Sequence, residues 1–187
     1  MPNESNKFNL KVNIPMPVRL PLYIFFAVVS ATFSGTAMST CLKDKPESTP
    51  TSRFVLKGGE AFDRKTKLTW SRCSVGASWN GSKCAGSVKL ISLDAAKEVA
   101  LKRGNSWHVP TIEELASIGE SRCINPTINS KVFPDVKDFG EGTAPYWSRT
   151  KIKEMPGLVY FIDFLSGEAD GHTKEFSLAV RLVRNGK

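Results

Sequence analysis

The chain has 187 residues, of which 41% are hydrophobic and 24% are charged, and its formal net charge is +8. This size and composition suit one folded domain with a leader, and they exclude a chain that is disordered throughout. Fourteen glycines and eleven prolines without a periodic repeat exclude the collagen-like and low-complexity classes. The two histidines, His108 and His172, argue against histidine-rich metal sites and Ser-His-Asp hydrolases.

The N-terminal segment is typical of a secretory signal peptide. Residues 1–19 are polar and weakly basic, and an uncharged run from Leu20 to Ala37 follows. The strongly apolar part of this run, residues 22–29, is too short to span a bilayer, which needs about 20 apolar residues. A basic region, a short apolar region and then small residues predict a signal peptide over 1–37 with cleavage after Ala37.

An uncleaved membrane anchor and a lipoprotein are the alternatives to this cleavage. Cys41 follows the apolar run closely enough for lipidation, although residues 38–40 make a poor lipobox. Cleavage after Ala37 removes three basic residues and one acidic residue, which takes the net charge from +8 to +6. We expect an exported protein, periplasmic or at the cell surface, that contacts a membrane only through such an anchor.

The four cysteines predict two disulfides. An even number of cysteines in an exported chain indicates a disulfide framework, and four cysteines allow three pairings. Cys73 and Cys84 lie close together in a Gly- and Ser-rich segment, which favours a local bond between them. Cys41 and Cys123 would then tie the N-terminal arm to the body. No C-x-x-C motif is present and neither histidine stands at zinc-finger spacing from a cysteine, so we expect no metal site.

The domain is expected over residues 53–187, after a polar arm or linker over 38–52 that contains two prolines. A first strand is predicted over 53–56. Residues 60–62 and 68–71 are expected to form a hairpin with 63–67 as its turn, where Asp63 would bond the backbone ahead of it. Residues 73–87 are expected to form a loop.

Two helices are predicted next. Ser92 is the expected N-cap of the first helix, whose apolar residues recur on one face, and Gly104 ends it. Thr111 and Glu114 form a capping-box motif. This motif predicts a second, short helix over about 112–119.

The C-terminal part is predicted to return to strands. Residues 123–136 are turn-rich, an aromatic strand begins at 145–148, and 158–164 is the strongest strand pattern in the chain. Residues 167–171 are expected to form a turn before a closing strand over 178–184. Helices grouped between strands in this way indicate an α+β fold with an antiparallel sheet.

Six short motifs follow one another between residues 62 and 184. They are F-D-x-x-T-x-L-x-W at 62–70, R-C-x-x-G-x-x-W at 72–79 with C-A-G at 84–86, W-x-x-P-T-x-x-E-L at 107–115, C-I-N-P-x-I-N at 123–129 with F-P at 133–134, Y-W-S at 146–148, and R-L-V-R at 181–184. In this order they resemble the Lcl C-terminal domain family, named for the domain that closes a Legionella collagen-like adhesin. The resemblance spans about residues 53–184.

This resemblance implies a C-type-lectin-like fold, with a twisted antiparallel sheet, two helices and a long disulfide-stapled loop region. The W-x-x-P-T-x-x-E motif also resembles the formylglycine-generating enzyme fold, which shares that core. The chain has His108 where the family usually has Arg. An ion pair that the family's Arg supports would therefore be formed only in part here.

Most of the motif residues are expected to be structural. Three tryptophans fall in strand-like segments and are expected to fill the core: Trp70, Trp107 and Trp147. Glu114 is expected to be a helix cap rather than an acid catalyst. Of Arg181 and Arg184, one is expected to pair with Asp163 inside the sheet and the other to be solvated.

Neither an enzyme nor a cofactor is expected. A calcium-dependent lectin site needs several carboxylate and amide oxygens around the ion, and the usual Glu-Pro-Asn, Gln-Pro-Asp and Trp-Asn-Asp motifs are absent. A weak site formed by Asp163, Glu168 and Asp170 stays open. Formylglycine-type catalysis needs a reactive cysteine pair, whereas all four cysteines here have expected disulfide roles.

The predicted ligand-binding residues are basic side chains and one loop tryptophan: Arg64, Lys65, Lys67, Arg72, Trp79 and Lys83. The first three gather in one turn, the others lie nearby in the sequence, and Trp79 is a candidate for stacking on a sugar. A basic patch on an exported domain favours sulfated glycosaminoglycan, anionic cell-wall polymer or lipopolysaccharide. The family's adhesin is associated with glycosaminoglycans, which supports this by resemblance only. The competing interpretation is scattered solubilising charge.

We therefore expect an exported, non-catalytic binding or adhesion domain at the bacterial cell envelope, whose partner is an anionic polysaccharide or an envelope protein. The alternative is a structural or assembly partner of a surface appendage or secretion system that acts through protein contacts. Nucleic acid is not an expected partner, because no binding motif for it is present. The sequence leaves the oligomeric state open.

Overall fold

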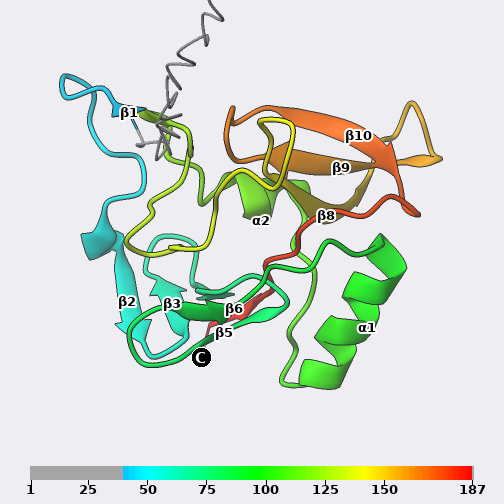
Figure 1. Ribbon diagram of the computed structural model, residues 1–187, viewed down its shortest axis with the longest axis horizontal. Helices are drawn as coiled ribbons and strands as arrows, with labels where there is room; N and C mark the ends of the chain where they lie inside the picture. The colour runs from blue at the N-terminus through cyan, green and yellow to red at the C-terminus, as the bar shows by residue number, and fades with distance from the viewer. Residues whose placement is uncertain (1–39, 187) are drawn as a thin grey trace, which may run out of the picture. The chain divides into compact units, whose positions relative to one another are not determined.

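The computed structural model describes residues 40–186 (Figure 1). The predicted signal peptide and its cleavage after Ala37 lie outside the described residues. Within 40–186, no helix has the length and apolar character that crossing a membrane requires. The described residues form two antiparallel sheets, two short ladders and two helices, which confirms the α+β class.

The first sheet has four antiparallel strands in the order β11-β4-β3-β2. They are β2 (Phe54–Lys57), β3 (Glu60–Asp63), β4 (Leu68–Ser71) and β11 (Val183–Asn185). Strands β3 and β4 are the predicted hairpin. Asp63 acts at its turn as expected, because its carboxylate accepts from the Lys65 N–H at 2.9 Å and from the Thr66 hydroxyl at 2.7 Å. Arg53, which ends the 3-10 helix η1 (Thr51–Arg53), donates from Nε to the same carboxylate at 2.7 Å.

The second sheet has three antiparallel strands in the order β10-β9-β8. They are β8 (Pro145–Lys151), β9 (Leu158–Asp163) and β10 (Ala169–Thr173). The predicted strand over 158–164 is confirmed, but the predicted turn over 167–171 is wrong in its second half, because residues 169–171 already pair with β9. The turn closes earlier, since Gly167 adopts φ +85° and donates its N–H to the Asp163 carbonyl at 2.7 Å.

The closing segment over 178–184 forms regular strand only at its end, in β11. The prediction of one continuous strand is wrong because this segment passes between the two sheets. The Trp147 N–H of β8 donates to the Ala179 carbonyl at 2.9 Å, whereas the Ser71 N–H of β4 donates to the Leu182 carbonyl at 3.0 Å. The segment thus bonds first to one sheet and then to the other, and it ties them together.

Two short ladders lie beside the two disulfides. Strand β1 (Thr40–Cys41) pairs with β7 (Cys123–Ile124), and β5 (Ala77–Trp79) pairs with β6 (Cys84–Gly86). The disulfides Cys41–Cys123 and Cys73–Cys84 are the predicted pairs. The predicted loop over 73–87 therefore contains a small hairpin. Two disulfides are typical of proteins outside the reducing cytoplasm, so they are consistent with export.

Helix α1 (Leu93–Arg103) begins and ends at the predicted residues. The Ser92 hydroxyl accepts from the Ala95 N–H at 3.4 Å, and Gly104 ends the helix at φ +67°, a conformation that favours glycine. Figure 1 shows α1 as a separate layer beside the strands.

Helix α2 (Ile112–Ala116) carries both halves of the predicted capping box. The Thr111 hydroxyl accepts from the Glu114 N–H at 3.2 Å, and the Glu114 carboxylate accepts from the Thr111 N–H at 2.7 Å. The helix ends at Ala116 rather than near Gly119, because the Gly119 N–H bonds three residues back, to Ala116, as in a tight last turn. Glu114 is thus the predicted cap.

The three tryptophans predicted in the core are buried: Trp70, Trp107 and Trp147 are 0%, 6% and 0% exposed. One hydrophobic cluster surrounds Trp70 and includes Leu115 of α2. A second cluster packs α1, through Leu93 and its neighbours, against Trp147. Each helix therefore covers its own part of the strands.

Arg184 pairs with Glu60 and Arg181 with Asp135, so the prediction that one of these arginines pairs with Asp163 is wrong. Arg181 is fully buried. Its Nη2 lies 2.6 Å from Asp135 Oδ1, and its Nη1 donates to two backbone carbonyls at the end of β4. Asp163, the last residue of β9, accepts from backbone N–H groups instead. Its Oδ1 accepts from the Ala144 N–H at 2.7 Å and from the Leu165 N–H at 2.9 Å.

Candidate functional site

The predicted basic turn joins β3 to β4. Its three cations, Arg64, Lys65 and Lys67, are exposed. Arg64 donates from Nη1 to the Ser52 carbonyl at 2.9 Å, while Lys65 and Lys67 have no ion-pair partner within residues 40–186. The two ammonium groups of this turn are therefore available to an external anion.

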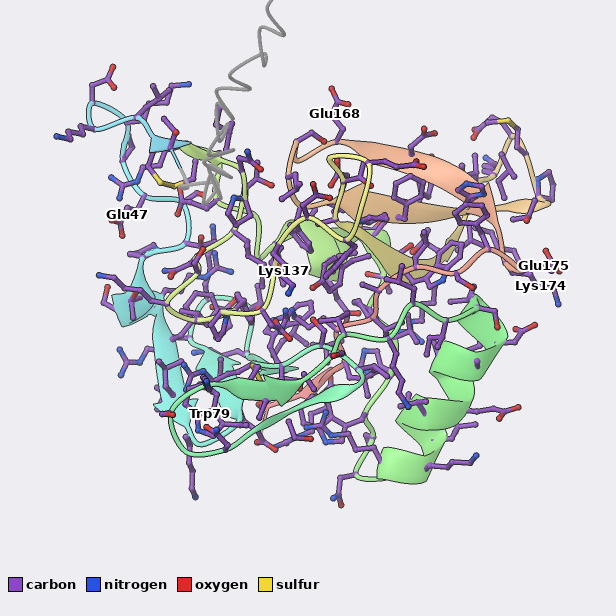
Figure 2. All side chains as sticks on the ribbon, viewed as in Figure 1. Glu47, Trp79, Lys137, Glu168, Lys174 and Glu175 are labelled. Carbon is purple, nitrogen blue, oxygen red and sulfur yellow. A yellow bond between two sulfur atoms is a disulfide. The ribbon has the colours of Figure 1, made fainter. Side chains whose placement is uncertain are left out.

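The other three predicted residues belong to the segment around the Cys73–Cys84 disulfide. Arg72 is 8% exposed, and its guanidinium stacks over the Trp79 ring at 3.7 Å from the centroid. Its N–H groups donate to three backbone carbonyls at 3.1–3.2 Å: Gly58, Lys131 and Val132. Arg72 therefore directs its donors into the protein and holds Trp79, which Figure 2 labels, against the fold. Lys83 is exposed.

The structure places these six predicted residues in two separate groups. The turn over 64–67 lies at one end of the β3–β4 hairpin, whereas at the other end the Arg72 N–H donates to the Gly59 carbonyl at 2.9 Å. Trp79 lies against Gly59. The strands between these ends have four residues each, which at about 3.3 Å per residue is a distance of roughly 13 Å. Closeness in the sequence therefore does not produce one site.

A third basic group, which the sequence analysis did not single out, lies on Trp107. Arg103, the last residue of α1, stacks over the Trp107 ring at 3.8 Å from its centroid, and Arg184 of β11 lies at 5.2 Å. A turn follows α1, in which the Trp107 N–H donates to the Gly104 carbonyl at 3.1 Å, and it brings Trp107 back to Arg103. A bridge between residues 108 and 183 then brings β11 alongside. One indole thus carries two guanidinium groups.

Glu60 is the acidic partner of this group among residues 40–186. Its Oε2 lies 2.8 Å from Arg184 Nη2, whereas Arg103 has no ion-pair partner there. Burial lowers the pKa of Arg103, Glu60 opposes this effect, and the charge of Arg184 adds to it. Arginine nevertheless stays protonated at neutral pH. Two guanidinium groups beside one carboxylate leave a net positive charge and unused N–H donors. These can bind a sulfate, phosphate or carboxylate group of a ligand.

Trp107 also lines an adjoining hollow of about 310 Å³ together with Lys97, His108 and Arg149. Arg149 is exposed and has no ion-pair partner in the described part of the chain. Lys97 lies 3.2 Å from Asp94, and His108 is paired with Glu114. Among the residues that the structure describes, no carboxylate lines this hollow. The positive surface at Trp107 therefore continues along α1.

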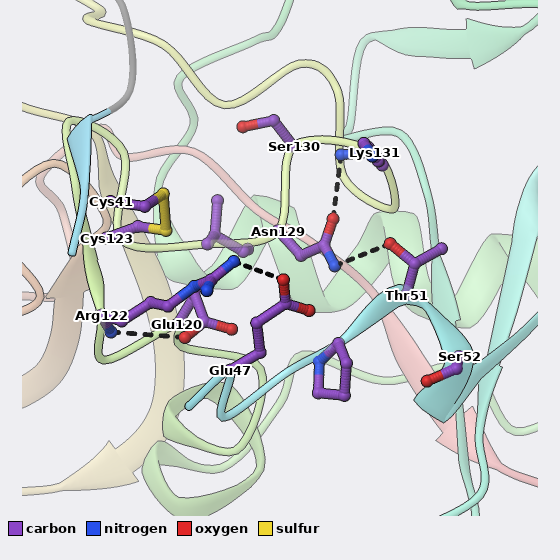
Figure 3. A pocket seen from close by; sticks show the side chains of 12 residues that line it. Cys41, Glu47, Thr51, Ser52, Glu120, Arg122, Cys123, Asn129, Ser130 and Lys131 are labelled. Atoms are coloured by element: carbon purple, nitrogen blue, oxygen red, sulfur yellow. Dashed lines mark hydrogen bonds and ion pairs between the residues drawn. A yellow bond between two sulfur atoms is a disulfide. The ribbon is translucent and has the colours of Figure 1, made fainter. Parts of the chain in front are cut away.

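A hollow of about 520 Å³ lies beside the Cys41–Cys123 disulfide, and Figure 3 shows that its polar side chains bind the N-terminal arm. Arg122 forms an ion pair with Glu47, and Asn129 Nδ2 donates to Thr51 Oγ1 at 3.1 Å. The buried Glu120 carboxylate accepts from the N–H and hydroxyl groups of two arm residues, at 2.8–3.1 Å: Ser48 and Thr49. The arm is pinned rather than free, and we assign no ligand to this hollow.

Within residues 40–186, one group of three potential metal ligands converges: Cys73, Cys84 and Asp135. The two sulfur atoms are bonded to each other, which leaves one carboxylate. Asp163, Glu168 and Asp170 line a common groove, but their oxygens do not converge in this way. The arrangement gives no support to the weak calcium site.

The sequence carried only a faint signal for Arg103 and Arg184. Both are far apart in the chain, so no local spacing connects them. Arg103 follows the general preference for cations in the last turn of a helix, and Trp107 is also explained by burial. Their meeting depends on the pairing of β11 with β4, which a local pattern does not contain.

A family model described as the Lcl C-terminal domain matches residues 59–184, which is more than half of the chain. The match includes the basic turn, the loop with Trp79 and both arginines on Trp107. A search of curated proteins gives no match.

Proposed function

The chain belongs to the Lcl C-terminal domain family, and we propose that it is an exported, non-catalytic binding module of the bacterial cell envelope that recognises an anionic polysaccharide. The observation that carries the proposal is that two guanidinium groups, those of Arg103 and Arg184, lie on the indole of Trp107. Among residues 40–186, the single carboxylate beside these two positive charges is that of Glu60, which pairs with Arg184. Sulfate, phosphate and uronate groups are the anions that such donors bind best. Lys65 and Lys67 add free charge on the β3–β4 turn.

We propose that the α+β fold is C-type-lectin-like. Two helices beside antiparallel sheets support this, as does the long irregular stretch between α2 and β8, in which β7 is the regular element among the described residues. Two disulfides staple segments outside the main sheets. In this proposal the scaffold presents loops and helix ends as the binding surface.

Export and a non-catalytic role are part of the same proposal. The signal-peptide pattern over 1–37 and the two disulfides support export. All four cysteines are in disulfides, so none is a free thiolate for formylglycine-type chemistry. The buried titratable pair, Arg181 and Asp135, ties backbone segments together and lies in the core.

Retention on immobilised heparin across a salt gradient tests the proposal, with a cation exchanger of matched charge density as the reference. The oxidised chain should elute from heparin at clearly higher salt than from the exchanger, because an organised site adds directional contacts to general attraction. Equal elution from both columns would mean that the positive charge acts without a site, and the proposal would fail.

One variant and its matched control test whether heparin binds at the Arg103 and Arg184 side chains on Trp107. Arg103→Gln should lower the heparin affinity about tenfold, which corresponds to ~1.4 kcal/mol, while its elution from the exchanger changes little. Lys153→Gln removes the same charge from the exposed β8–β9 connection and serves as the matched control. If both variants lose the same retention, the anion does not bind at Trp107.

The second candidate function is that of a structural or assembly partner that acts through protein contacts. Edge strand β2 favours it, because β2 pairs only with β3 in the described part of the chain and exposes Val55 and Leu56 by 42% and 38%. Salt-insensitive co-purification of the chain with one envelope protein would favour this function over glycan binding.

A further inference from the structure

The three-stranded sheet carries a groove of about 330 Å³ whose chemistry is opposite to that of the Trp107 surface. Carboxylates line it: Glu141, Asp163, Glu168 and Asp170. Aromatic and apolar side chains also line it: Phe161, His172, Phe176, Pro145 and Leu178. Within residues 40–186, no Lys or Arg belongs to the lining.

The register of β9 and β10 explains why these groups share one face. Phe161 lies opposite Asp170, and alternate residues of a strand point to the same side. Val159, two residues before Phe161, belongs to that face and is buried in the cluster that packs α1. Further along the same face, Phe161 and Asp163 line the groove. The groove is therefore the uncovered end of a core-forming face.

Stacked aromatic rings form one wall of the groove. The rings of His172 and Phe176 lie 3.6 Å apart between centroids at 14°, and Phe161 lies 6.1 Å from His172. Phe176 is 49% exposed. A flat aromatic surface beside carboxylates attracts cations twice, through the negative face of the ring and through the carboxylate charge.

The negative charge of the groove is not neutralised within the described residues. Glu141, Glu168 and Asp170 have no ion-pair partner among residues 40–186. The sequence has no Lys or Arg over 138–148 or over 154–173, although the chain carries a net charge of +8. Figure 2 labels Glu168 at one end of β10 and Lys174 at the other, where Lys174 binds Asp94 of α1 at 2.9 Å instead.

Strand β10 also offers an edge that pairs with no second strand among residues 40–186, although its Thr173 carbonyl already accepts from the Phe176 N–H at 3.1 Å. It pairs with β9 alone in the part of the chain that the structure describes. The Gly171 N–H donates to the side chain of the preceding residue, Asp170, at 2.7 Å. An extended segment that paired with β10 would place every second side chain over the face that carries Asp170 and His172.

We propose that this groove and the β10 edge bind an extended segment of a protein partner that has Lys or Arg at alternate positions. The backbone of the segment adds a strand to β10, and its cationic side chains enter the groove between the aromatic wall and the carboxylates. The free edge favours a peptide over a small amine or an amino sugar, because neither of these uses unpaired backbone groups. This binding is independent of the anion surface at Trp107.

Fluorescence anisotropy with labelled synthetic octapeptides and the full oxidised chain tests the proposal. The first probe alternates Thr and Lys. The second has the same composition in two blocks of four. The third is the alternating peptide with every residue N-methylated, which keeps the charge and removes the backbone donors of both strand edges. The alternating peptide should bind at least tenfold more tightly than the other two. Equal binding of all three, or no binding, overturns the proposal.

Variants locate the peptide on the groove. Glu168→Gln with Asp170→Asn should weaken the alternating peptide about tenfold, and the new Asn still offers an acceptor to the Gly171 N–H. Glu154→Gln, an exposed acid outside the lining, is the matched control and should leave binding unchanged. Arg103→Gln should also leave it unchanged, which separates this result from the heparin test. Unchanged binding in the groove variant, or displacement by glucosamine without discrimination among the peptides, overturns the proposal.

Discussion

His108 and Glu114 form an ion pair at the start of α2, with His108 Nε2 at 3.3 Å from each carboxylate oxygen of Glu114. The two side chains are 24% and 20% exposed. Glu114 also accepts from the Thr111 N–H, so the capping box and the ion pair share one carboxylate. His108 stands where an arginine was expected from the family resemblance. The pair is therefore made by a group that loses its charge near neutral pH.

The first prediction is that this pair makes stability depend on pH. The hydrogen bond to Glu114 raises the pKa of His108 above 6.5. Burial opposes the change at Glu114, but the bonds from His108 and Thr111 lower its pKa below 4.5. The histidine contribution is complete below pH 6.5 and is lost as the pH rises through the raised pKa. The glutamate contribution is present above pH 4.5 and is lost as the pH falls through the lowered pKa. Both groups are charged between these limits.

Unfolding in urea from pH 5 to 9 measures this dependence. His108→Gln should cost about 1 kcal/mol at pH 5.5 and much less at pH 9. His108→Arg should keep the pair charged and remove the loss above neutral pH. A cost of His108→Gln that is the same at both pH values would show that the histidine acts by packing alone.

The second prediction concerns the buried pair of Arg181 and Asp135. Asp135 holds Arg181 through one oxygen and accepts from the Ser74 N–H through the other, at 2.6 Å each. Asp135→Ala leaves a fully buried guanidinium without its counter-charge, which costs about 3–5 kcal/mol. The urea midpoint should fall accordingly, whereas Glu154→Ala, at an exposed acid, should change it little. Adding Arg181→Met to Asp135→Ala should restore part of the loss, and a further loss would contradict this account.

Local signals predicted the elements whose cause is local. The capping box at 111–114, the N-cap Ser92 and the turn residue Asp63 each act through bonds within a few residues, and the structure has each of them. The disulfide pairing also followed from chain order, because a short Gly- and Ser-rich segment favours local closure.

The sequence did not predict which residues far apart in the chain contact one another. One of Arg181 and Arg184 was expected to pair with Asp163, yet Asp163 accepts from the backbone N–H groups of Ala144 and Leu165. Arg181 pairs with Asp135 instead, and Arg184 pairs with Glu60. The two arginines on Trp107 depend on the pairing of β11 with β4. Likewise, the six predicted ligand-binding residues form two separate groups, because the β3–β4 hairpin lies between them. Strand pairing decides which charged side chains contact one another. The hydrophobic pattern and the turn residues do not determine this pairing.

The third prediction is that the two disulfides differ in their effect on stability. Cys41–Cys123 joins residues 82 apart, whereas Cys73–Cys84 joins residues 11 apart. In the loop-entropy description, removing the first costs about 4.5 kcal/mol and removing the second about 3 kcal/mol. Urea unfolding of Cys41→Ser/Cys123→Ser and of Cys73→Ser/Cys84→Ser measures the two costs. A larger loss for the short loop would mean that the Cys73–Cys84 bond acts through native contacts rather than through the unfolded chain.

The last prediction is that Glu120 keeps the arm pinned even without the disulfide. Burial opposes the ionisation of this carboxylate, but hydrogen bonds from Ser48, Thr49 and Arg122 lower its pKa below 4.5. In Cys41→Ser/Cys123→Ser the arm should therefore resist proteolysis after Lys43 by trypsin at pH 8. Adding Glu120→Gln should speed cleavage about tenfold, because the amide offers one acceptor where the carboxylate offers two. For pepsin, the cleavage rate of the arm without Glu120→Gln, divided by the rate with Glu120→Gln at the same pH, should rise as the pH falls from 4.5 to 2, since protonation of Glu120 removes its charge-assisted bonds. Glu141→Gln in the same background, which removes an exposed carboxylate outside the arm contacts, should leave the trypsin rate unchanged. Equal trypsin rates with and without Glu120→Gln would instead assign the pinning to Asn129 and the ion pair of Arg122 with Glu47.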